Sequence, residues 1–215
     1  ALAVRDGGHW VEWWRRDTAT TWWDEGAPLA ARVGWRPATA GVELGELQLR
    51  GGSEAWRTRL VLVRVDPRRV TLSLTPAFTE GRSWAVADAA NDVSLALDAG
   101  QFRQSLPWGW VVSGGREVLA PQYAPLAGAV LIDSAGAVRV VSPGEVASAR
   151  ARGDAREAFQ SYPMLLENGR VPAPLTKPGR GVDLEHRDGR LALGTLADGR
   201  VVIALTRFDA LGEVL

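Results

Sequence analysis

Short runs of hydrophobic residues, separated by turn sequences, make up most of the chain after residue 40. Residues 60–65 are almost continuously apolar, which is typical of a strand buried on both faces. Hydrophobic and polar positions alternate in residues 70–75 and again in 93–97, which predicts strands with one face in the core. The Asp-Pro-Arg-Arg sequence at 66–69 predicts a turn between the first two strands.

Two hairpins are predicted in the middle of the chain. Residues 110–112 lead into Ser-Gly-Gly at 113–115, where the chain is expected to turn back. Residues 130–132 are expected to turn at 134–136 and return through 138–141.

The strongest turn signals are Asn168-Gly169 and Asp198-Gly199, because both dipeptides suit a hairpin turn with positive φ at two positions. The second lies between the apolar runs 191–196 and 201–205, which predicts a hairpin. We also expect the apolar run 164–166 to be a strand, with the polar residues before it at the start of that strand.

One helix is well signalled. Ser142, Pro143 and Glu145 fit the N-cap, N1 and N3 positions of a capping box, and Gly153 can end the helix. A short helical turn is expected at 155–159. These elements predict an α+β fold, with a mostly antiparallel or mixed sheet of hairpins and a few helices.

Residues 1–40 hold six of the ten tryptophans. Trp10, Trp13 and Trp14 have the spacing of one helix face. Such rings stack on sugars, but more often they fill a core or cover a sheet. We therefore expect residues 1–40 to be a Trp-rich segment that packs on a main domain, residues 41–215.

The composition excludes several classes of function. The net charge is zero, with 25 basic and 25 acidic residues, so we expect no nucleic-acid partner. The chain has no Cys and two His, which argues against a metal site, and we expect no cofactor. It contains no phosphate-binding loop, nucleophile elbow or apolar run long enough to span a membrane.

Asp98, Gly100, Gln101 and Phe102 form a first polar cluster directly after the predicted strand 93–97. A carboxylate, an amide and an aromatic ring beside a glycine that allows close backbone approach are suited to a binding site at a strand end. The alternative is an ordinary turn with the Phe102 ring in the core.

Gln160 and Ser161 form a second cluster, before the apolar run 164–166. They are candidates for contacting a ligand, and the alternative is that their side chains satisfy backbone groups of the fold.

His186, Arg187 and Arg190 form a third cluster, at the entry to the predicted strand 191–196. The planar guanidinium groups are suited to holding an anion such as a phosphodiester. The alternative is a solvated turn at Asp188-Gly189.

The segments VSLALDAGQF (93–102), AFQSYPMLLENG (158–169) and RLALGTLADGRVV (190–202) together resemble the phosphodiester glycosidase family. That family is named for the "uncovering enzyme", which removes N-acetylglucosamine from a phosphodiester. They are similar to its Asn-x-Gly-x-Phe, Pro-(Leu/Met)-Leu-x-x-Asn-Gly and Arg-x-Ala-x-Gly segments. LVLVRVDPRRVTLSL (60–74) resembles its opening hairpin. The resemblance covers residues 40–215 and implies an α+β domain around a central cleft.

The chain departs from the family pattern at two places. Position 98 is Asp where the family usually has Asn, which changes a neutral amide into a possible acid or base. The family also has an Asp-Gly-Gly segment, which bears on the active site, after a further helix. Residues 210–215 look like the first turn of a helix, so we expect the main domain to lack its C-terminal part here.

The resemblance implies a hydrolase that acts on a glycosidic bond in a sugar phosphodiester or cell-envelope glycan. Asp98 and Arg190 would be catalytic, with Arg190 binding phosphate or stabilising charge on the leaving group. The substrate-binding residues would be Gln101, Phe102, Gln160, Ser161, His186 and Arg187.

The alternative is a non-catalytic glycan-binding or structural module of the cell envelope. The Trp-rich N-terminus and the Asp at position 98 both favour this reading. Under either reading the expected partner is a carbohydrate or sugar phosphate. The expected location of a bacterial member is exported (periplasmic, envelope or extracellular), and a cytoplasmic location stays open.

Overall fold

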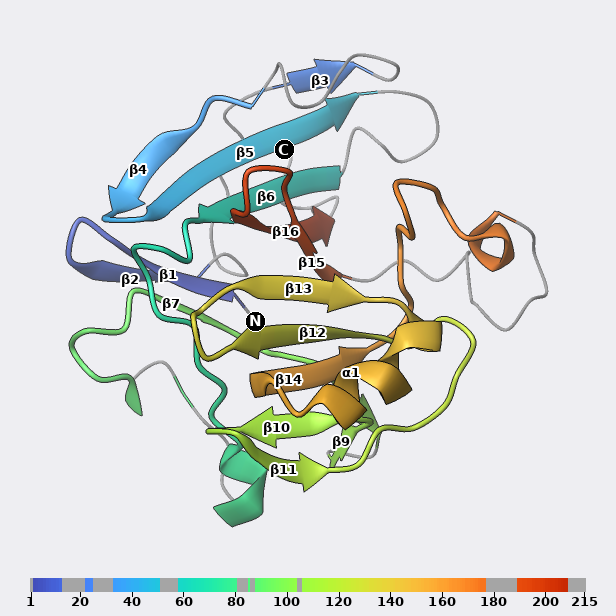
Figure 1. The fold of residues 1–215 in the computed structure, drawn as a ribbon. Coiled ribbons are helices and arrows are strands. Elements are labelled where there is room, and N and C mark those ends of the chain that lie inside the picture. The colour runs from blue at the N-terminus through green and yellow to red at the C-terminus, as the bar shows by residue number, and fades with distance from the viewer. Residues whose placement is uncertain are drawn as a thin grey trace. The chain divides into compact units, whose positions relative to one another are not determined.

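The computed structural model describes residues 2–12, 22–24, 33–50, 58–80, 85, 88–103, 106–176 and 189–208. The chain forms two compact units, each described by itself below (Figure 1). Unit 1 comprises Ala1–Val70, Ala85–Asp98 and Arg187–Leu215, and unit 2 comprises Thr71–Trp84 and Ala99–His186. The division into residues 1–40 and 41–215 stays a prediction.

Unit 1 is built on a six-stranded sheet with the order β15-β16-β6-β5-β3, in which β4 also pairs with β5. Its strands are antiparallel except for β3, which runs parallel to β5. The register places Leu44, Val63 and Ile203 side by side, and each is at most 1% exposed. The strands are β3 Trp22–Asp24, β4 Arg36–Thr39, β5 Val42–Arg50, β6 Thr58–Val65, β15 Leu191–Thr195 and β16 Val201–Phe208.

A smaller antiparallel sheet in unit 1 has the order β2-β1-β7, formed by His9–Glu12, Leu2–Asp6 and Leu95–Leu97. Leu2 and Val4 of the central strand are fully buried. Trp10 lies in β2, where the Arg5 guanidinium packs over its ring at 4.8 Å. The predicted helix face for Trp10 is therefore wrong. Trp13 and Trp14 lie outside the described residues.

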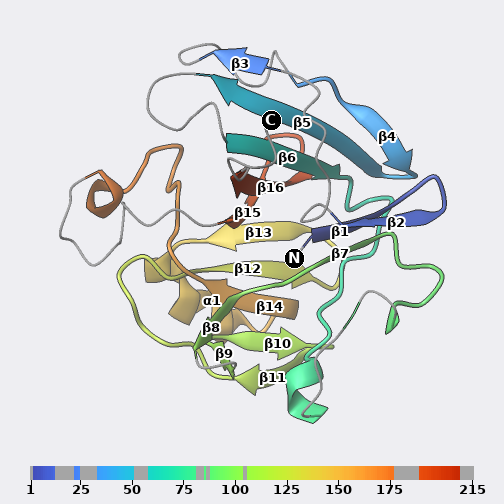
Figure 2. The same ribbon diagram turned by 180° about the vertical axis from the view of Figure 1, so that it is seen from behind.

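Unit 2 is built on a five-stranded antiparallel sheet with the order β11-β10-β14-β12-β13. The α-helix α1, Val146–Arg152, buries Val146 and Ala149 in one cluster with Trp110, Leu131 and Ala158 of the sheet. A short hairpin, β8 with β9, lies at one end of β10 (Figure 2). The strands are β8 Gln101–Arg103, β9 Leu106–Trp108, β10 Val111–Ser113, β11 Arg116–Leu119, β12 Gly128–Asp133, β13 Val138–Val141 and β14 Ala155–Ser161.

Most of the predicted hairpins are confirmed, because the turn residues occur where the strands reverse. β10 pairs with β11 across Gly114-Gly115, and β12 pairs with β13 across the 134–136 turn. β15 pairs with β16 around Asp198-Gly199. Strand β6 and the 66–69 turn also form as predicted, with the Arg69 N–H donating to Asp66 O at 3.0 Å.

The predicted helix is confirmed at both ends. A 3-10 turn, Pro143–Glu145, leads into α1, and the Glu145 carboxylate accepts hydrogen bonds from the Ser142 N–H at 3.0 Å and the Ser142 hydroxyl at 2.8 Å. Gly153 ends the helix in the left-handed region with φ of 65°. Two further 3-10 turns are Ala77–Glu80 and Ala173–Leu175.

The predicted α+β fold class is wrong, because the described residues are 48% strand and 11% helix, with α1 as their only α-helix. The expected helical turn at 155–159 is instead β14, which lies between β10 and β12 and pairs with both. Ala, Arg and Glu favour helices in isolation, but here cross-strand pairing on two sides outweighs that preference.

Two predicted strands do not form. Residues 70–75 alternate between partly buried and exposed positions but make no strand, and side chains of the sheet bond to them instead. The Arg156 guanidinium donates to Leu72 O, and the Ser113 hydroxyl donates to Leu74 O. The run 164–166 is not a strand either, since Leu165 is 51% exposed and Leu166 is 59% exposed.

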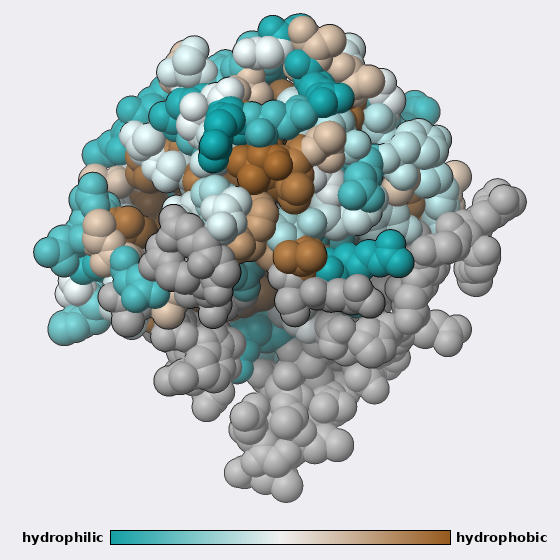
Figure 3. Space-filling model, turned by 90° about the horizontal axis from the view of Figure 1, so that it is seen from below, coloured by the Kyte–Doolittle hydropathy of each residue, from teal (hydrophilic) through white to brown (hydrophobic). Residues whose placement is uncertain are grey.

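Hydrophobic residues reach the surface in separate patches with hydrophilic residues between them (Figure 3). In unit 2 the exposed large side chains include Phe102, Leu106 and Tyr123. Within the part of the chain that the structure describes, no helix has the length and apolar character needed to cross a membrane.

Replacing Glu117 by Gln should destabilise unit 2 at neutral pH and flatten its acid dependence. The Arg150 guanidinium and the Trp110 indole N–H hold the pKa of Glu117 below its usual value. This stabilisation is therefore present above the unfolded-chain pKa of about 4.3 and is lost as the pH falls through the folded-state pKa. A partly exposed pair of this kind contributes about 0.2–1 kcal/mol.

The check is thermal unfolding at pH 7 and pH 3 for the wild type, Glu117→Gln and Glu167→Gln, since Glu167 is an exposed carboxylate in the same unit. The predicted role of Glu117 is wrong if the two variants behave alike at both pH values.

Candidate functional site

Gln160 is buried at the end of β14, and its amide is fully hydrogen-bonded to backbone groups of unit 2. The side chain is 2% exposed. Its Oε1 accepts the N–H groups of Trp110 at 3.0 Å and Gln122 at 3.1 Å. Its Nε2 donates to Gln122 O at 2.8 Å and to Ala127 O at 3.2 Å. A carboxamide has two donors and two acceptor sites, so none is left for a sugar.

Gln160 and Ser161 face opposite sides of the sheet, because successive strand residues alternate. Gln160 pairs with Ala129, which is 2% exposed and belongs to the cluster under α1. Ser161 pairs with Gly128 and is only partly buried. Of the two predicted substrate-binding residues, the geometry therefore favours a structural role for Gln160 and leaves Ser161 as the ligand candidate.

Two glycines pack closely against Gln160. Gly100 has φ of 81°, and a methyl group there would lie 3.2 Å from Gln160 O. Gly109 has φ of 86°, and a methyl group there would lie 2.5 Å from Gln160 Oε1. Only glycine combines this positive φ with so close an approach. The β8–β9 hairpin lies between these glycines, so Gln160 holds it at both ends.

This packing brings the first and second motif segments together in unit 2. Gly100 lies against Phe159 and Gln160, on the side of the sheet that Ser161 faces. Gln101 and Phe102 follow in β8, and both side chains are exposed, Phe102 by 49%. The predicted substrate-binding role of Phe102 stays a prediction, and its ring is half exposed to solvent rather than in the core.

The two predicted catalytic residues belong to unit 1. Asp98 follows β7 in the small sheet and is exposed. Arg190 precedes β15 in the large sheet, where its backbone N–H donates to the Thr206 hydroxyl at 2.8 Å. The structure therefore places them on different sheets. His186 and Arg187 lie outside the described residues.

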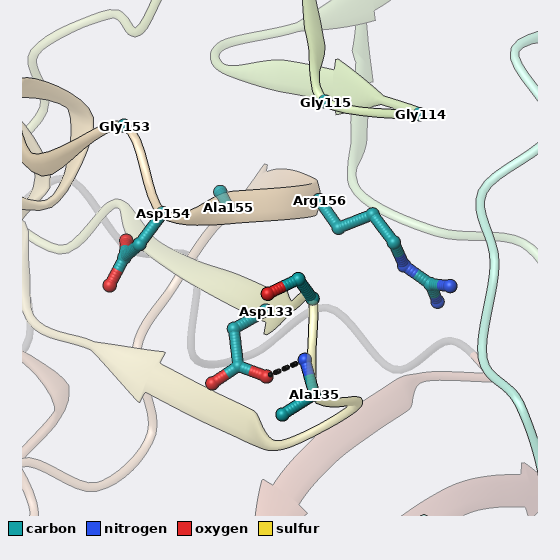
Figure 4. Close-up of a pocket in the computed structure, with 9 residues that line it drawn as sticks. Gly114, Gly115, Asp133, Ala135, Gly153, Asp154, Ala155 and Arg156 are labelled. Carbon is teal, nitrogen blue, oxygen red and sulfur yellow. Dashed lines mark hydrogen bonds between the residues drawn. The ribbon is translucent and has the colours of Figure 1, made fainter.

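A hollow of about 420 Å³ lies in unit 2 where three turns meet, and none of the predicted site residues that the structure describes lines it (Figure 4). Its carboxylates are already engaged. Asp133 Oδ1 accepts the N–H groups of Ala135 and Ala137, both at 2.9 Å, and Asp154 pairs with Arg139 at 2.7 Å. Asp154 and Arg156 point in opposite directions (Figure 4). These side chains do not converge on a ligand.

A second hollow, of about 540 Å³ in unit 1, is lined by ion pairs. Arg68 pairs with Asp66 at 2.8 Å, Arg200 pairs with Asp198 at 2.7 Å, and Arg200 also reaches Glu43 at 3.4 Å. Arg69 also lines the hollow, so three arginines face three acids and there is no excess charge of either sign to recognise a ligand.

No group of three or more His, Asp or Glu side chains suited to a metal ion is found among the described residues. No protein-family model matches the chain, and no curated protein is significantly similar to it. The comparisons therefore do not test the resemblance to the phosphodiester glycosidases.

Gly109, Gln122 and Ala127 surround Gln160, and no local pattern in the sequence marks them as its partners. A strand prediction for residues 158–161 would have placed Gln160 and Ser161 on opposite faces, as the alternating burial of these residues shows. The backbone partners could not be found this way, because they lie 33 to 50 residues away in the chain.

Replacing Gln160 by Met should destabilise the protein by about 3 kcal/mol, because the buried backbone groups of Trp110 and Ala127 and the partly buried ones of Gln122 lose their partner. Ser161→Ala is the matched control, since it changes the next residue of the same strand on the other face. We expect it to cost less than about 0.5 kcal/mol. The measurement is denaturant unfolding. Equal stability of Gln160→Met and wild type would show that the Gln160 amide is not structural.

Proposed function

We propose that the protein is a glycosidase-type hydrolase that acts on a sugar phosphodiester or a cell-envelope glycan. The proposal rests on three segments in the order of the phosphodiester glycosidase motifs. The observation that supports it most is the contact of Gly100 with the Gln160 backbone, which joins the first two of these segments. A glycine-dependent contact between distant segments is expected where a binding loop must be held rigidly.

In this proposal the Asp98 carboxylate either takes a proton from the water that attacks the anomeric carbon, or attacks that carbon itself and forms a glycosyl-enzyme that water then hydrolyses. The bond from the anomeric carbon to the phosphate oxygen breaks, and Arg190 stabilises the negative charge on the leaving phosphate. A phosphate ester is a weakly basic leaving group, so it needs less protonation than a sugar alcohol does. One carboxylate can therefore serve where most glycosidases use two. Within unit 2, Gln101, Phe102 and Ser161 stay predicted ligand contacts, and Gln160 would position their segments.

A non-catalytic glycan-binding module is the second candidate. Position 98 holds Asp where the resembled motif holds Asn, and aromatic side chains in unit 2 are exposed without a partner that the described residues supply. Such a module would bind the sugar phosphodiester without releasing free sugar.

Replacing Asp98 by Ala should lower turnover of a sugar phosphodiester about 100-fold or more while leaving the protein folded, because the reaction loses its carboxylate. Asp92→Ala is the matched control, since Asp92 is an exposed carboxylate six positions earlier. The assay measures sugar released from methyl N-acetylglucosaminyl phosphate.

Asp98→Asn distinguishes a reacting carboxylate at position 98 from a side chain that only forms hydrogen bonds, as the Asn of the resembled motif would. It should be as inactive as Asp98→Ala if the carboxylate acts as base or nucleophile. Wild-type turnover in Asp98→Ala would contradict the assignment. Binding of the diester by wild-type protein without any release would favour the non-catalytic module.

A further inference from the structure

One face of the β8–β9 hairpin combines an amide, a guanidinium and an indole. Gln101 pairs with Trp108 and Arg103 pairs with Leu106, so these four side chains share a face of the two-stranded ribbon. Gln101 and Arg103 are exposed, Leu106 is 63% exposed, and Trp108 is partly exposed. Among the interactions of the described residues, none engages the side chain of Gln101 or Arg103.

Arg103 is the only charged residue in the sequence stretches 99–115, 118–132 and 158–166, which are flanked by charged residues such as Asp98, Glu117 and Glu157. In the unit 1 hollow, by comparison, the Arg68 and Arg200 side chains are paired with aspartates. A guanidinium without an acidic neighbour in these segments favours an anion from outside the protein.

The hairpin is held in place by features already described. Gly100 precedes β8 and Gly109 follows β9, and both pack against Gln160. A ribbon fixed at both ends presents its face with little ordering cost when a ligand binds. The partly exposed Trp108 ring offers an apolar surface suited to the C–H groups of a sugar.

We propose that this face binds the sugar phosphodiester itself. The Arg103 guanidinium holds the phosphate, the Trp108 ring packs against the sugar, and the Gln101 amide bonds to the sugar hydroxyls. This assignment rests on the proposed function for the class of ligand, but it concerns binding and does not depend on turnover.

The test is isothermal titration calorimetry with two probes, methyl N-acetylglucosaminyl phosphate and methyl N-acetylglucosaminide, which has the same sugar and no phosphate. Wild-type protein should bind the diester more tightly than the glycoside. Arg103→Gln should weaken diester binding about tenfold or more and leave glycoside binding unchanged, because only a charge-assisted contact is lost. Arg116→Gln is the matched control, since Arg116 is an exposed arginine of the same unit.

The inference is overturned if Arg103→Gln binds the diester as wild type does, or if Arg116→Gln weakens it equally. It is also overturned if wild-type protein does not prefer the diester. Tight diester binding that depends on Arg103, without release of sugar, would support this site and contradict the proposed hydrolysis. Release of sugar by the wild-type protein, together with unchanged diester affinity in Arg103→Gln, would support the proposed hydrolysis and contradict this binding site.

Discussion

The four hydrogen bonds of the Gln160 amide are the interaction on which the candidate site of unit 2 depends. A buried carboxamide is costly to desolvate and stabilises a fold only when its donors and acceptors are all satisfied. Here the partners are backbone groups of Trp110, Gln122 and Ala127, which belong to segments distant in sequence. The amide therefore fixes the end of β14 relative to Trp110 and to the segment of Gln122 and Ala127. Hydrogen bonds are directional, so they specify this arrangement more closely than apolar packing alone would.

The hydrogen bonds of the Gln160 amide explain how the β8–β9 hairpin can be exposed to solvent and still be held in place. Because Gly100 and Gly109 lie against Gln160, the hairpin between them does not need its own side chains for anchoring. Gln101 and Arg103 are thus available to a ligand. The hydrogen bonds of the Gln160 amide favour a positioning role, whereas the substrate contact that the resemblance implies for Gln160 stays a prediction.

Local signals in the sequence predicted local structure well. The Ser142–Glu145 cap, the Gly153 stop and the glycine turns determine conformation over a few residues, and the elements they bound form as expected. Residues 155–161 were wrongly predicted to begin with a helical turn, because their strand depends on pairing with β10 and β12. For the same reason, the sequence did not show that Gln160 and Ser161 lie on opposite faces of a strand. The relation of Asp98 to Arg190 is equally a matter of tertiary arrangement, which no local pattern encodes.

The most direct test of the central claim is amide hydrogen exchange measured by NMR on the wild-type protein. The account predicts that the backbone N–H groups of Trp110 and Gln122 and the side-chain NH₂ of Gln160 exchange slowly, at a rate governed by unfolding of the surrounding sheet. Exchange of these groups near the rate of an unprotected peptide, while neighbouring strand amides stay protected, would contradict the claim that the Gln160 amide holds these segments together.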